Sequence, residues 1–83
     1  MEMKHFKRIM EKSDSTRVLI LTSQYQIIGD VYECEECNKD SCINLVNVRV
    51  CNFDKTFDGI CENDAKFNWL HVNLDKINAF SFI

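Results

Sequence analysis

Three of the five cysteines gather in one short polar segment, and their spacing is the strongest chemical signal in the sequence. Two residues separate Cys34 from Cys37, and four more precede Cys42. The two-residue spacing lets a pair of thiolates reach one tetrahedral metal ion from a tight turn, and Cys51 or Cys61 could supply a fourth ligand. The segment therefore predicts a structural zinc site as one alternative, and we expect no other cofactor.

Free thiols and a disulfide are the other two alternatives for this segment. Zinc motifs usually contain two paired knuckles, and the chain has no second pair at that spacing. Glu35, Glu36 and Asp40 surround the thiols with negative charge, which disfavours the thiolate that a reactive redox cysteine needs. The spacing alone leaves the three alternatives open.

No arrangement of catalytic residues accompanies the cysteines. No serine has a base partner or a nucleophile elbow around it, and His5 and His71 read as ordinary surface histidines. Aromatic side chains can stack on bases, but in so small a chain we assign Phe67, Trp69, Phe80 and Phe82 to the core or to a subunit interface. We predict a binding protein rather than an enzyme.

Length and charge narrow the class of protein further. We expect 83 residues to form a single domain spanning 1–83, located in the cytoplasm, because no apolar run approaches the ~18 residues of a membrane span. A net charge of −3 argues against strong generic binding to nucleic acid. Four of the basic residues nevertheless share the first dozen positions, so an acidic chain can still present one basic face.

A hairpin around Gly29 organises the predicted elements. Val18–Thr22 and Gln26–Tyr32 read as antiparallel strands joined by a turn at Ser23–Tyr25. A glycine inside an apolar strand marks a sharp bend or a close backbone approach, and strongly bent strands close a short sheet into a small barrel.

The remaining segments add a helix and three more strands. Residues 1–12 have apolar side chains at helical spacing, and residues 43–51 alternate, with Val46, Val48 and Val50 on one face and Asn47 and Arg49 on the other. Residues 52–66 read as a long loop, residues 67–73 and 77–82 as the fourth and fifth strands, and residues 74–76 as a tight connection. We predict an all-β, five-stranded, strongly bent antiparallel barrel of the SH3-like type over residues 17–83, with a short N-terminal helix.

This order of elements resembles the Sm-like fold. Ile27–Val31 is similar to the family's apolar-x-Gly-x-apolar signature, Ile43–Val50 falls where the third strand of the first Sm motif would lie, and Val72–Phe80 has the spacing of the second motif. The second motif departs from the family at Asn73-Leu74, where Arg-Gly is common. The resemblance suggests a divergent bacterial Sm-like protein of unknown function.

The resemblance also implies a function and a set of contacts. Sm-like proteins typically form homo-oligomeric rings through their fourth and fifth strands and bind single-stranded RNA, and position within the motifs makes four residues the candidate RNA contacts: Asn44, Asn47, Asn73 and Lys76. The alternative is a protein-interaction or scaffold module that binds a partner through the cysteine segment or the 52–66 loop. No membrane association is expected.

Overall fold

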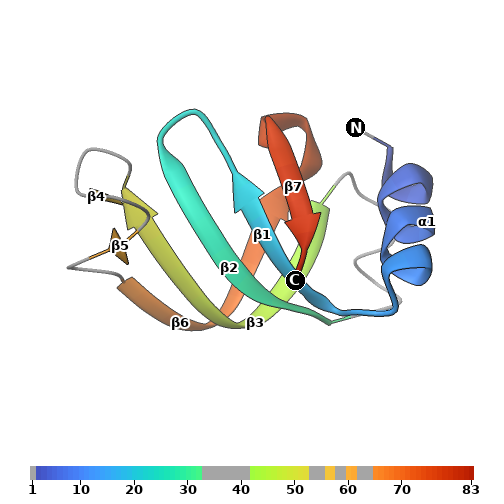
Figure 1. Cartoon of the computed structure of the whole chain (residues 1–83), viewed down its shortest axis with the longest axis horizontal. Helices are drawn as coiled ribbons and strands as arrows, with labels where there is room; N and C mark the ends of the chain where they lie inside the picture. Colours follow the sequence, from blue (N-terminus) through green and yellow to red (C-terminus); the bar gives the residue numbers. More distant parts are fainter. Residues whose placement is uncertain (1, 33–41, 53–55, 58–59, 62–64) are drawn as a thin grey trace.

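A single bent sheet, with a helix at one end, forms the body of the protein (Figure 1). The computed structural model describes residues 2–32, 42–52, 56–57, 60–61 and 65–83. The elements in chain order are α1 (Met3–Ser13), β1 (Arg17–Leu21), β2 (Tyr25–Tyr32), β3 (Cys42–Asn52), β4 (Thr56–Phe57), β5 (Ile60–Cys61), β6 (Ala65–Asn73), the 3-10 helix η3 (Leu74–Lys76) and β7 (Ala79–Phe82).

The five longer strands are antiparallel and lie in the order β6-β3-β2-β1-β7. Figure 1 shows β3 and β6 curving beneath β1 and β2, with α1 beside one end of the sheet and the β4–β5 hairpin at the other. The predicted fold, a short N-terminal helix followed by five bent antiparallel strands, is confirmed. The predicted 52–66 loop is corrected, since it contains the β4–β5 pair and the beginning of β6.

Gly29 lies where the sheet bends. Ile28 pairs with Arg49 and Asp30 with Val46, so one residue of β2 stands opposite two residues of β3 in a β-bulge. A Cβ atom at position 29 would lie 3.2 Å from Leu45 Cβ and 3.2 Å from Val48 Cγ2. The glycine therefore allows the close approach of β3, as its position within an apolar strand predicted.

The bulge also corrects the predicted face of β3. Asn47 has a left-handed φ of 54°, a conformation that asparagine tolerates better than most residues. The left-handed backbone at Asn47 interrupts the alternation of inward and outward side chains along β3. Leu45 and Val48 therefore both lie in the buried core, while Val46 is half-buried and outside it. The prediction that Val46 shares a face with Val48 is wrong for this reason.

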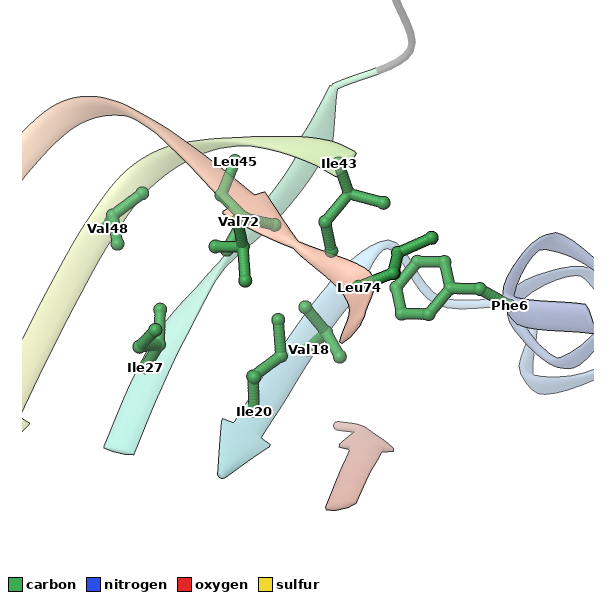
Figure 2. Packing of buried hydrophobic residues seen from close by; sticks show 9 residues of the cluster. All are labelled: Phe6, Val18, Ile20, Ile27, Ile43, Leu45, Val48, Val72 and Leu74. Carbon is green, nitrogen blue, oxygen red and sulfur yellow. The ribbon is translucent and has the colours of Figure 1, made fainter. Parts of the chain in front are cut away.

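The core lies between the concave side of the sheet and the helix, and Figure 2 shows its members converging from both. Phe6 is the one buried residue of α1, and its ring lies 5.0 Å from Phe80 and 5.2 Å from Phe82 between centroids. Burying a phenylalanine contributes about 1.5–3 kcal/mol, so this side chain anchors the helix to the sheet. The buried hydrophobic cluster consists of Phe6, Val18, Ile20, Ile27, Ile43, Leu45, Val48, Val72 and Leu74.

Candidate nucleic-acid interface

The end of β6 and the short helix η3 present two of the predicted contacts. Asn73 accepts a hydrogen bond from the Asp75 backbone N–H at 2.9 Å, which caps η3, and the side chain remains exposed. Lys76 is exposed in the last turn of η3. Leu74 is fully buried and fixes this connection to the core, so it positions an amide and an ammonium group at one end of the sheet.

The other two predicted contacts lie elsewhere. Asn44 is only 1% exposed, at the register position between Tyr32 and His71, and it is not a member of the hydrophobic core. Asn47 is exposed at the bulge. Its position in the register is opposite Asn68 of β6. Asn68 is five residues before Asn73, which corresponds to roughly 17 Å along the strand. The structure therefore brings Asn73 and Lys76 together and leaves the two β3 residues apart from them.

Asn47 borders a small depression, the bulge hollow, with a volume of about 230 Å³. Arg49 and Lys66 are paired across β3 and β6 within it, and both are exposed. The hollow is lined by Asn47, Val48, Arg49, Lys66, Phe67 and Asn68.

The two outer edges of the sheet are the second candidate surface. In the part of the chain that the structure describes, β6 pairs only with β3 and β7 only with β1. Beside β6 lies a largely apolar groove of about 430 Å³ that also includes Asn73 of the first surface; it is lined by Tyr25, Ile27, Val50, Ala65, Phe67, Leu70, His71, Val72 and Asn73. An edge strand with apolar surface beside it is suited to pairing with another strand.

Exposed basic side chains line one side of α1. Lys4, Arg8 and Lys12 recur at four-residue intervals and are all exposed, so they form one basic stripe on the helix. On the sheet, Arg17 and Asp30 form an ion pair of 3.4 Å. The predicted basic region of the first dozen residues is thus a solvent-facing stripe of the helix.

The cysteine prediction is only partly within the described residues. Cys34 and Cys37 lie outside them, while Cys42 begins β3 as a half-buried free thiol. Cys51 is disulfide-bonded, so its sulfur is not a thiolate ligand in this form of the protein. Among the described side chains, no group of three or more metal-binding residues is found.

Two aromatic side chains of β6 lie at the surface and outside the core. Trp69 and Phe67, which the sequence assigned to the core or to a subunit interface, are each 44% exposed, so the core is excluded and the interface stays a prediction. Tyr32, 50% exposed, lies 5.1 Å from Trp69 between ring centroids. The signal that could have found this cluster is the bulge, because it reverses which residues of β3 and β6 face the core.

Comparison with known proteins identifies a structural neighbour of the fold. No model of a known protein family matches the sequence, and no curated protein is found as a relative. Among solved structures, the chain is similar to the Sm protein of Pyrococcus abyssii, whose structure was solved in complex with a uridine heptamer. The match has a TM-score of 0.60 and 13% sequence identity, and it covers 93% of this chain and 96% of the other.

The similarity over nearly the whole length of both chains defines the fold as Sm-like. It is a fold of short, strongly bent strands, and in this chain the bend occurs at Gly29 and the Asn47 bulge. Among the described residues, no helix is long and apolar enough to cross a membrane.

Proposed function

We propose that this protein binds single-stranded RNA as a homo-oligomeric ring. The observation that supports the proposal most is the match, over 93% of the chain, to a protein solved with a uridine heptamer. The exposed amide of Asn73 and the ammonium of Lys76 are suited to a base edge and a phosphate, respectively. A ring would repeat this pair once per subunit and gain affinity through multivalency.

The ring would form by pairing β6 of one subunit with β7 of the next. The Ile83 N–H donates to the Arg17 carbonyl at 2.8 Å. Because N–H groups alternate in direction along a strand, those of Phe80 and Phe82 face away from β1, toward the outer edge of β7. These donors are available to a second copy, and Ile83, 56% exposed, would extend that strand beside the apolar groove.

Binding to a short oligo-U tests the RNA proposal. Asn73→Asp keeps an oxygen that can cap η3 but replaces the amide donor with a negative charge, and Lys76→Gln removes a positive charge. The combined variant is expected to bind labelled heptauridine at least tenfold more weakly in fluorescence anisotropy. Lys4→Gln with Lys12→Gln changes the net charge by the same amount on the helix and is the matched control.

The two variants give distinct outcomes. Native mass spectrometry should find both in the same oligomeric state as the unmodified protein, with affinity reduced only in the Asn73→Asp, Lys76→Gln variant. Equal losses in both variants would mean that net charge rather than the β6–η3 end determines binding, and unchanged affinity in the first would refute the assignment.

Assembly is tested separately at the groove. Phe67→Lys places a charge on the open side of the apolar groove at a residue that is already 44% exposed, so the subunit itself should fold. The expected result in native mass spectrometry is dissociation to monomers. Tyr32→Lys, which changes an equally exposed ring outside the groove, should leave the oligomer intact; dissociation in that control instead would refute pairing at β6.

The scaffold alternative rests on segments that lie mostly outside the described residues, the 33–41 stretch and much of 52–66. No described contact favours it, so the RNA proposal stands as the better supported function.

A further inference from the structure

Three aromatic rings from two strands form an exposed cluster, here called the aromatic platform: Tyr32 of β2 with Trp69 and His71 of β6. The ring centroids of Tyr32 and Trp69 are 5.1 Å apart, and those of Trp69 and His71 are 6.2 Å apart. All three side chains are exposed, Tyr32 by 50% and Trp69 by 44%. The exposed apolar surface of the rings is in unfavourable contact with water, so a ligand that covers the rings would gain free energy by removing this surface from water.

The strand register explains why these rings face outward. His71 pairs with Asn44, which pairs with Tyr32, and Trp69 pairs with Val46, so the three rings lie on the same side of the sheet. The intervening residues of β6, Leu70 and Val72, point to the core side. The platform therefore contributes nothing to the buried hydrophobic cluster.

A hydrogen bond fixes two of the rings relative to each other. Trp69 Nε1–H donates to His71 Nε2 at 2.9 Å. An indole nitrogen can only donate, so Trp69 is the donor of this bond and His71 the acceptor. The bond holds the two rings in one relative orientation, so the platform presents pre-organised ring faces.

Polar and cationic groups flank the platform at both ends of β6. On one side, next to Trp69, lies the bulge hollow with the exposed cation Lys66. On the other side, two residues beyond His71, lie Asn73 and then Lys76. The carboxylate on the same face, that of Asp30, is paired with Arg17. Rings between cations suit a polyanion that carries flat unpaired bases.

We propose that the aromatic platform stacks unpaired nucleobases of a single-stranded RNA that runs along β6 from the bulge hollow to the Asn73–Lys76 end. This inference rests on the proposed function and adds a second contact region to it. It also joins two groups of predicted contacts that are otherwise about 17 Å apart. A protein partner on the same rings is the competing occupant, and the measurements below distinguish it from RNA.

Trp69 makes the inference directly measurable, because it is the single tryptophan of the chain. Its fluorescence can be followed while the full-length protein is titrated with heptauridine, and anisotropy of labelled heptauridine measures total binding in parallel. Inorganic polyphosphate is the control ligand, since it has the charge but no bases. Stacking predicts a saturable change in Trp69 fluorescence with heptauridine and none with polyphosphate.

Substitution provides the second arm. Trp69→Leu removes the ring with little change in polarity, and it is expected to weaken heptauridine binding about tenfold or more, as the loss of one stacked base would. His5→Leu, which alters an exposed ring of α1 away from the platform and the groove, should bind as the unmodified protein does. His71→Gln should have a smaller effect than Trp69→Leu.

The outcomes separate this inference from the proposed function. Anisotropy that does not respond to heptauridine would refute RNA binding itself and the platform with it. Normal binding with unchanged Trp69 fluorescence, or normal binding by Trp69→Leu, would overturn the platform alone. Dissociation of the oligomer in Trp69→Leu, seen by native mass spectrometry, would show that the rings form a protein interface and would likewise overturn it.

Discussion

Replacing Gly29 by alanine tests the bend on which the whole sheet depends. The added methyl group would lie 3.2 Å from Leu45 Cβ, 3.2 Å from Val48 Cγ2 and 3.4 Å from the Val46 carbonyl oxygen. Leu45 Cβ is fixed to the backbone of β3 and the side chain is fully buried, so it cannot rotate away. The backbone of β3 must shift instead.

The magnitude follows from two opposing effects. Overpacking a close-packed site costs about 1–3 kcal/mol, while alanine recovers about 0.4–1 kcal/mol by reducing the entropy of the unfolded chain. Subtracting the two ranges leaves a loss of about 0–2.6 kcal/mol in the free energy of unfolding, and because Leu45 Cβ cannot move aside we expect about 1–2 kcal/mol. For a chain of this size that corresponds to a melting temperature lower by roughly 5–15 °C.

Urea unfolding followed by far-UV circular dichroism measures the loss in the free energy of unfolding. All variants are compared at the same protein concentration, because assembly would contribute to the apparent stability. Val48→Ala, alone and combined with Gly29→Ala, completes a double-mutant cycle. The combined variant should be more stable than the sum of the single losses by at least about 0.5 kcal/mol, since removing the Val48 methyl groups makes space for the new one. A Gly29→Ala protein as stable as the unmodified one would refute the close approach.

Three further outcomes are expected. Phe6→Ala should lower the free energy of unfolding by about 3–5 kcal/mol in urea titrations, whereas Arg8→Ala on the exposed side of the same helix should change it by about 0.5 kcal/mol or less; similar values would mean that Phe6 does not anchor α1. Arg17→Gln should cost less than about 1 kcal/mol, and less still in high salt, because the Arg17–Asp30 pair is partly exposed; a larger, salt-independent cost would contradict this. A zinc site in the cysteine segment predicts about one zinc per chain by elemental analysis, lost in Cys37→Ser, and zinc-free protein would leave the thiol and disulfide alternatives.

The elements of the fold could be read from the sequence because each carries a local signal. The apolar spacing in residues 1–12 predicted a helix that the structure has at Met3–Ser13, and the alternation in residues 43–51 predicted a strand now seen at Cys42–Asn52. Gly29 marked the bend because a side chain at this position would crowd Leu45 and Val48 of β3. The helix, the strand and the bend are thus each determined by residues that are close together in the sequence, so the local pattern of apolar residues and glycine predicts them.

Side-chain direction on β3 and β6 could not be read in the same way. The bulge at Asn47 is a tertiary feature, formed where β3 crosses Gly29, and it shifts the alternation by one residue. That shift puts Val46 outside the core. On β6, Trp69 faces solvent, so a ring assigned to packing became a candidate for ligand contact.

The four predicted RNA contacts divide for a related reason. Their positions within the motifs put all four residues in one group, but the first motif includes both buried and exposed positions of β3. Asn44 is buried, Asn47 is exposed at the bend, and Asn73 lies with Lys76 at the far end of β6. Sequence spacing gives the order of residues along a strand, and only the register across strands determines which of them share a surface.

Native mass spectrometry of the full-length protein with and without heptauridine is the most direct test of the central claim. The expected result is a closed oligomer whose mass increases by a bound oligonucleotide, with that increase lost in the Asn73→Asp, Lys76→Gln variant at unchanged oligomer mass. A monomer that binds no oligonucleotide would contradict both the ring and the RNA-binding function, while leaving the Sm-like fold as it stands.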